Sequence, residues 1–126
     1  MSIAVDVAVW AGVMMIGGIG SVVRYMVDRT VARRTAGSFP FGTLTVNITG
    51  AVLLGFISGL TLSHHAALLT GTAFVGAYTT FSTWMLETQR LAEEGEVAPP
   101  AANLLISPAL GMALAAAGWA LGSVLA

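Results

Sequence analysis

Residues 76–84 read GAYTTFSTW, a hydroxyl-rich stretch inside an otherwise apolar block that runs from Ala66 to about Leu91. The block is long enough to cross a bilayer, which takes roughly 20 residues of helix. A glycine followed by several hydroxyl and β-branched side chains disfavours a continuous helix. Irregular backbone at membrane depth persists only where protein buries it or where it lines a wet cavity. We therefore expect the helix to break here and functional groups to gather at the break.

Three further apolar blocks accompany this one, at residues 7–26, 42–62 and 101–125. Hydrophobic residues make up 56% of the 126-residue chain and charged residues only 9%, whereas about 25% of a soluble domain is charged. The composition predicts a single all-α transmembrane domain over residues 1–126, with four transmembrane helices of which the third is broken mid-membrane. The first block is too long for a signal peptide and lacks a basic start, so we expect the mature protein to keep it.

Small residues in two of the blocks predict tight helix packing. Gly55 and Gly59 have small-xxx-small spacing in the second block, and the fourth contains Gly111, Gly118 and Gly122. Such residues let two helix backbones approach closely within a membrane.

Charge and cysteine content exclude several function classes. The formal net charge is −1 and no basic run exceeds two residues, so we expect no nucleic-acid partner. The absence of cysteine excludes a disulfide framework, a thiolate metal site and a cysteine nucleophile. The predicted first and third loops carry four arginines, Arg29, Arg33, Arg34 and Arg90, whereas the loop on the opposite side of the membrane carries none. This bias places the first and third loops in the cytoplasm and both termini outside.

Polar residues within the blocks form two stripes. Thr43 and Asn47 are four residues apart and share a helical face, and so do Asn103 and Ser107. In hydrocarbon each such group must find a partner or serve a pathway. Taken one at a time, they are more simply explained as hydrogen bonds between neighbouring helices.

An aromatic pair and the scarcity of carboxylates favour an anion as the ligand. Phe81 and Trp84 are three residues apart, and aromatic edges carry the positive end of the ring quadrupole. Neutral amide, hydroxyl and backbone donors can replace the hydration shell of a small anion. A cation pathway would more naturally use a carboxylate, and Glu87 is the one candidate within the blocks.

Residues 17–25 (GGIGSVVRY), 40–50 (PFGTLTVNITG) and 76–84 resemble the three signature stretches of the Fluc (CrcB-type) fluoride channel family. Asn103, Ser107 and Gly111 are similar to its fourth-helix pattern. The resemblance covers nearly the whole chain.

The resemblance implies an antiparallel dimer that exports fluoride passively across the bacterial cytoplasmic membrane and so lowers cytoplasmic fluoride. It implies a structural sodium ion at the dimer centre, held by the backbone carbonyls of Gly76 and Thr79. The residues implied for the fluoride pathway, some by the polar stripes as well, are Asn47, Phe81, Trp84, Ser107, Thr43, Thr83, Glu87, Asn103 and Arg24.

The chain departs from the family pattern in two ways. Trp84 stands where the family has its second pore phenylalanine, and its larger ring and N–H group could narrow the path or contact the ion differently. The arginine bias favours one orientation of the subunit in the membrane, whereas an antiparallel homodimer needs both orientations. The partner is therefore either a second copy of this chain or a paralogue that inserts in the opposite orientation.

Two rival functions follow from the same composition. A small proton-coupled multidrug transporter would place a glutamate in the first span, where this chain has Met14, Met15 and Gly17. An intramembrane enzyme would need a nucleophile and base or a metal set at membrane depth. The sequence has no GxSxG motif, and His64 and His65 lie in a predicted turn with no third ligand nearby, so we expect no enzyme. A purely structural, lipid-facing subunit would leave the polar stripes unexplained.

Overall fold

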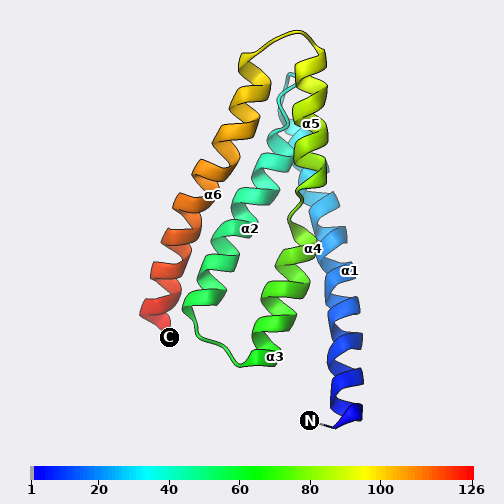
Figure 1. Ribbon diagram of the computed structural model, residues 1–126, viewed down its shortest axis with the longest axis vertical. Coiled ribbons are helices and arrows are strands. Elements are labelled where there is room, and N and C mark those ends of the chain that lie inside the picture. The colour runs from blue at the N-terminus through cyan, green and yellow to red at the C-terminus, as the bar shows by residue number, and fades with distance from the viewer. Residues whose placement is uncertain (1) are drawn as a thin grey trace.

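The computed structural model describes residues 2–126, which are almost entirely helical (Figure 1). The chain runs up through α1, down through α2, up through the segments from α3 to α5, and down through α6 (Figure 1). Both chain ends therefore lie at the same end of the molecule. The elements are α1 (Ile3–Arg34), α2 (Phe41–Gly59), α3 (His64–Ala67), η1 (Leu68–Val75), α4 (Gly76–Tyr78), α5 (Ser82–Glu93) and α6 (Ala98–Leu125).

Three of these helices, α1, α2 and α6, are long and apolar enough to cross a membrane. Large apolar side chains stand exposed along them: Met14 is 78% exposed, Trp10 60% and Val124 80%. Few large hydrophobic side chains are buried, so the apolar surface needs a hydrocarbon solvent rather than water. The chain is an all-α, multi-pass membrane protein.

The predicted boundary of the first loop is wrong. That loop was expected to contain Asp28, Arg29, Arg33 and Arg34, but α1 continues through them to Arg34. The charged turns extend the helix beyond its apolar part, and the last two arginines interact favourably with the negative end of the helix dipole.

The histidine pair is also misplaced by the sequence prediction. His64 and His65 begin α3 rather than forming a turn, and the Ser63 side chain accepts a hydrogen bond from the Ala66 N–H at 3.3 Å as the cap. Similarly, α6 begins at Ala98, before the predicted start at residue 101, and Pro99 and Pro100 lie in its first turn, where proline's missing N–H costs nothing.

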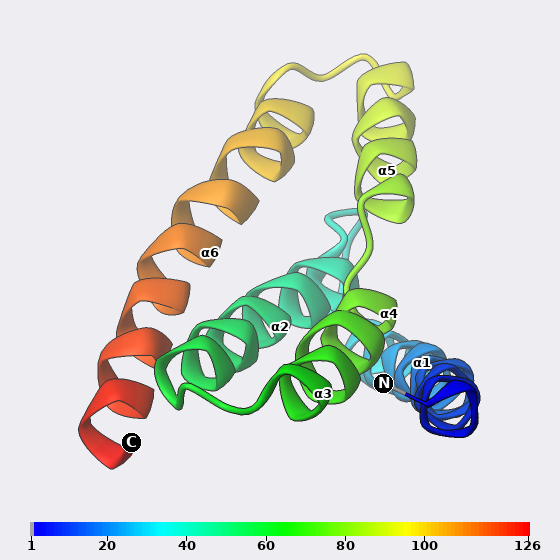
Figure 2. The ribbon, with the colours of Figure 1, turned by 60° about the horizontal axis from the view of Figure 1, so that its bottom comes forward.

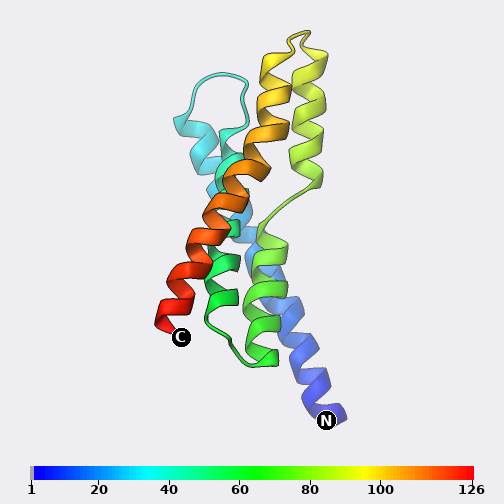
Figure 3. The same cartoon turned by 60° about the vertical axis from the view of Figure 1, so that its left-hand side comes forward.

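The third apolar block is divided into several segments. After α3, η1 is a π-helix, a rare conformation that is often found at functional sites. Helical structure ends at Tyr78, Thr79 is extended (φ −82°, ψ 162°), and α5 begins at Ser82. Figure 3 shows the non-helical segment that joins α4 to α5. The four-span count, a mid-membrane position for this gap and the dimer stay predictions.

The most extensive helix contact is between α2 and α6, which are neighbours in Figure 2. Glycines of both helices lie at this contact. A Cβ atom at Gly55 would overlap the Ala115 carbonyl oxygen, and one at Gly118 would overlap the Val52 carbonyl oxygen. Both neighbours are backbone atoms, so neither can move aside alone. The small-residue spacing thus corresponds to direct backbone contact.

We expect Gly118→Ala to destabilise the protein by about 1–3 kcal/mol, because the added methyl group forces the two backbones apart. Gly111→Ala is the matched control in the same helix, since its new methyl group would meet only the Ala51 side chain at 3.8 Å. The measurement is the fraction of each variant that stays monodisperse in detergent after heating. Equal heat resistance of the two variants would contradict the close backbone contact.

Candidate functional site

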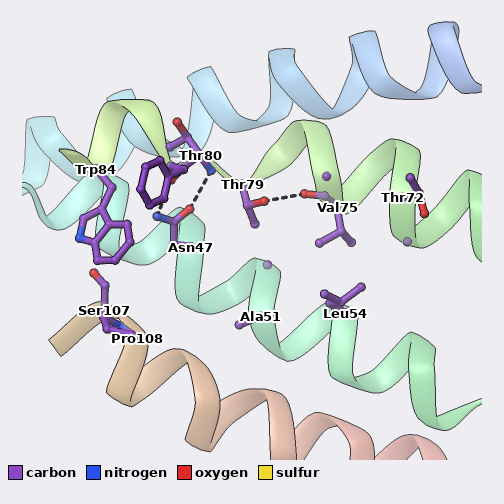
Figure 4. Close-up of a pocket in the computed structure, with 14 residues that line it drawn as sticks. Asn47, Ala51, Leu54, Thr72, Val75, Thr79, Thr80, Trp84, Ser107 and Pro108 are labelled. Carbon is purple, nitrogen blue, oxygen red and sulfur yellow. Dashed lines mark hydrogen bonds between the residues drawn. The ribbon is translucent and has the colours of Figure 1, made fainter. Parts of the chain in front are cut away.

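A groove of about 570 Å³ lies beside the gap between α4 and α5 (Figure 4). Its walls come from α2, from η1 and α4, from the start of α5 and from the middle of α6. Most of its surface is apolar, with a few polar groups near the gap. It brings together six of the predicted site residues, namely Asn47, Gly76, Thr79, Phe81, Trp84 and Ser107.

The Asn47 side chain pairs with the backbone of Thr80 in both directions. Its Nδ2 donates to the Thr80 carbonyl at 2.9 Å, and the Thr80 N–H donates to Asn47 Oδ1 at 2.9 Å (Figure 4). This pairing satisfies two backbone groups that lost their helical partners at the gap. Asn47 keeps a second N–H beside the groove, because an amide nitrogen has two.

The pairing also affects the carbonyl of Gly76. In a continued helix the Thr80 N–H would donate to that carbonyl, but here it donates to Asn47. No other backbone donor within residues 2–126 replaces it. The Gly76 carbonyl is therefore a free acceptor at the end of a helical segment, where the helix dipole is negative.

The Thr79 carbonyl has a cationic neighbour. Arg24 Nη1, from α1, donates to it at 3.5 Å, a long hydrogen bond. A carbonyl oxygen has two lone pairs, so this contact leaves one for another ligand. Arg24 lies well inside α1 rather than at a helix end, and its charge faces the gap.

The start of α5 offers hydrogen-bond donors, the opposite of the carbonyl acceptors at the end of α4. The Thr80 hydroxyl accepts a hydrogen bond from the Thr83 N–H at 3.2 Å and so caps this helix. For the N–H groups of Phe81 and Ser82, residues 2–126 contain no backbone acceptor. A helix beginning with free donors thus stands close to one ending with free carbonyls.

Two aromatic rings stand at one end of the groove. Phe81 and Trp84 make an edge-to-face pair with centroids 5.6 Å apart and an interplanar angle of 85°. Phe81 is 69% exposed beside the groove. Its ring is therefore available to a ligand or to a second protein surface.

Asn103 does not line the groove. It is 1% exposed, and its Nδ2 donates to Thr88 Oγ1 at 2.8 Å and to the Trp84 carbonyl at 3.4 Å. The Asn103 amide is left with an unpartnered acceptor oxygen, not with a donor for an anion. Ser107, one turn further, is buried at the groove with its hydroxyl unpartnered among the described residues.

Two smaller hollows contain the remaining predicted residues. One of about 210 Å³ touches Arg24, Thr43 and Thr83, and one of about 500 Å³ touches Glu87. The Thr43 hydroxyl donates to Glu87 Oε1, and Arg90 lies 3.8 Å from Glu87 Oε2. Thr80 is shared by the groove and the first hollow. Asp28 is shared by the two hollows, so each of the three spaces adjoins the next.

Three residues of this region were not singled out from the sequence. Thr80 was one hydroxyl among several, yet its backbone is the partner of Asn47. Thr88 bonds to the Asn103 side chain, and Asp28 lines both smaller hollows. Asp28 follows Arg24 by four residues, which on a helix places both on one face, so a longer first helix would have revealed it.

Comparisons with known proteins agree on one family. Residues 11–119 match the family described as CrcB-like protein, Camphor Resistance (CrcB). The chain is 65% identical over 117 residues to the fluoride-specific ion channel FluC 2 of Mycobacterium bovis, covering 93% of each chain. It is 41% identical over 113 residues to FluC 1 of Streptomyces avermitilis, covering 86% of this chain and 91% of the relative. It is 40% identical over 114 residues to FluC of Maridesulfovibrio salexigens, covering 86% and 90%.

Proposed function

Because this chain belongs to the CrcB-like family, whose curated relatives are named fluoride-specific ion channels, we propose that it conducts fluoride across a membrane. Proteins of this family are channels and not enzymes, which excludes the enzymatic alternative. We further propose that it lies in the bacterial cytoplasmic membrane and lets fluoride leave the cytoplasm down its gradient.

The observation that carries this function is the α4–α5 gap, with Asn47 paired to Thr80 beside an open groove. Non-helical backbone is costly in hydrocarbon unless protein buries it or it lines a wet pathway, and here the groove leaves it open on one side. Here the gap offers neutral donors, namely the second Asn47 N–H and the backbone N–H groups at the start of α5. Donors of this kind can replace water around a small anion.

The remaining site residues extend this pathway in both directions. The Phe81 ring edge and the Ser107 hydroxyl continue it along the groove, and Thr43, Thr83 and Arg24 continue it into the 210 Å³ hollow. Glu87 borders the outermost space. Asn103 belongs to the wall behind the pathway, because both of its N–H groups are used within the protein.

A sodium ion fits the carbonyls of Gly76 and Thr79 in its donor chemistry. Hard monovalent and divalent cations take oxygen ligands, and the Gly76 carbonyl is free because Asn47 has taken its helical partner. The Thr79 carbonyl keeps one lone pair beyond its contact with Arg24. A bound cation here would raise the electrostatic potential felt by a passing anion.

If sodium binds at these carbonyls, it should stabilise the folded protein. We expect the melting temperature in detergent to be several degrees higher in sodium chloride than in the same concentration of N-methylglucamine chloride, by mass action. Differential scanning fluorimetry measures this directly. Identical melting temperatures over a wide concentration range would remove the sodium site while leaving fluoride conduction open.

The same open groove supports the proposal of a second subunit. The free polar groups beside Asn47 would otherwise face lipid, which cannot form hydrogen bonds with them. We propose that an antiparallel subunit covers the groove. It is either a second copy of this chain or a paralogue of opposite orientation, which the four-to-none arginine bias would favour.

Growth of bacteria lacking a fluoride exporter tests both the ion and the direction of transport. Expression of this chain should restore growth in fluoride medium, and the Gly111→Ala variant should restore it equally well. An empty vector should not restore growth. Membrane insertion without any gain in fluoride tolerance, alone or with the paralogue, would count against export.

A further inference from the structure

We propose that Trp84 is a positioning residue that latches α5 to α6, and that its indole N–H is not a ligand of the permeating ion. The part of the test that measures flux rests on the proposed fluoride conduction. The latch is defined here as Trp84, Thr88 and Asn103.

The latch consists of reciprocal contacts between two helices. The Trp84 indole N–H donates to the Asn103 carbonyl of α6 at 2.8 Å. In return the Asn103 side chain donates to the Trp84 carbonyl at 3.4 Å and to Thr88 Oγ1 at 2.8 Å. The Thr88 hydroxyl donates to the Trp84 carbonyl at 2.8 Å, so its oxygen is free to accept from Asn103. Each residue of the latch thus contacts both of the others.

The indole has no second donor to offer. Tryptophan carries a single N–H and no acceptor, and that N–H is used on a backbone carbonyl inside the protein. The ring still lines the groove opposite Ser107 (Figure 4). What the ion path meets at Trp84 is therefore an aromatic ring, as it would at a phenylalanine, and the nitrogen serves as the anchor.

The anchored ring in turn holds Phe81. The two rings are in edge-to-face contact at 5.6 Å, and Phe81 is otherwise 69% exposed. Because Trp84 is fixed to α6 through its side chain and its backbone, Phe81 gains a rigid neighbour on the groove side. The latch consequently sets where the Phe81 ring lies. The chain itself connects α5 to α6 only through the short loop at the other end of α5 (Figure 1).

Nuclear magnetic resonance of the indole N–H groups tests the ligand question directly. The chain has three tryptophans, Trp10, Trp84 and Trp119, so selectively ¹⁵N-labelled protein in lipid nanodiscs gives few signals, and Trp84→Phe assigns one of them. We expect the Trp84 signal to stay unchanged as fluoride is added, like that of Trp10 outside the groove. A saturable shift of the Trp84 signal alone would overturn the proposal.

Two substitutions test the positioning role by flux. Trp84→Phe removes the anchoring N–H but keeps an aromatic ring and both hydrogen bonds that Asn103 donates to α5, so we expect fluoride flux to fall by no more than roughly threefold. Trp84→Ala removes the neighbour of Phe81, and flux should fall by roughly tenfold or more. If Trp84→Phe loses as much flux as Trp84→Ala while amide exchange in α6 stays as in the unchanged protein, the nitrogen itself serves the ion and the proposal fails.

Hydrogen exchange separates the latch from the proposed function. Loss of one hydrogen bond in Trp84→Phe should speed amide exchange at the start of α6 roughly threefold to tenfold, with α1 unaffected. Unchanged exchange there would contradict the latch. A protein with the expected exchange and an unshifted indole signal but no fluoride flux would retain the latch and lose the proposed channel function.

Discussion

Replacing Asn47 with leucine should lower fluoride flux by roughly a hundredfold or more. Leucine has a similar size but cannot pair with Thr80, so the Thr80 N–H and carbonyl lose both partners. An unsatisfied buried group costs up to about 1–3 kcal/mol, so the gap is expected to rearrange until these two part-buried groups find new partners. The cheapest repair is for the Thr80 N–H to return to the Gly76 carbonyl, which lengthens the helix and closes the gap. The donors and the free carbonyl are then lost together.

The matched control is Thr45→Val in the same helix. Thr45→Val also replaces a hydrogen-bonding side chain with an apolar one of nearly equal size. The Thr45 hydroxyl, however, bonds only within α2, to the Phe41 carbonyl at 2.8 Å. We expect this variant to conduct normally. Flux is measured with a fluoride electrode after reconstitution, and amount and dispersity are checked by size exclusion. A well-dispersed Asn47→Leu protein with normal flux would show that the pairing is dispensable.

Phe81→Ile should reduce fluoride flux by a similar factor, roughly a hundredfold, while leaving the fold intact. The ring is largely exposed, so its loss creates little cavity. Isoleucine is apolar but lacks the positive ring edge that attracts an anion. It also lacks the edge-to-face contact with Trp84. A large loss of flux without a loss of stability is the expected signature of a side chain that contacts the ion.

Trp119→Leu provides the control for that substitution. Trp119 is an aromatic residue of α6 that is 56% exposed, and it lines none of the hollows described above. We expect its loss to leave flux unchanged. If Phe81→Ile and Trp119→Leu conduct equally well, the aromatic ring in the groove has no role in permeation.

The sequence predicted the helical character and the apolar segments well, because composition and block length report directly on hydrocarbon burial. It placed the ends less well. Charged residues such as Arg33 were predicted to lie in a loop, although the negative end of a helix dipole stabilises arginines there. His64 and His65 were predicted to lie in a turn, although they begin a helix that Ser63 caps.

The candidate site was predicted as a set of residues but not as a set of bonds. Spacing could place Asn47 on a polar stripe, yet only the crossing of α2 over the gap shows that its amide pairs with Thr80. Likewise nothing in the sequence shows that Asn103 turns its donors to Thr88 and Trp84. Such contacts join residues that are distant along the chain, and local patterns contain no information about them.

Fluoride efflux from liposomes containing only this purified chain tests the central claim most directly. The account predicts rapid release of fluoride, no comparable release of chloride, and loss of the fluoride signal in the Asn47→Leu protein. If the chain needs a paralogue of opposite orientation, the same selective release appears on co-reconstitution. No fluoride release in either preparation, or equal release of chloride, would contradict the assignment of this chain as a fluoride channel.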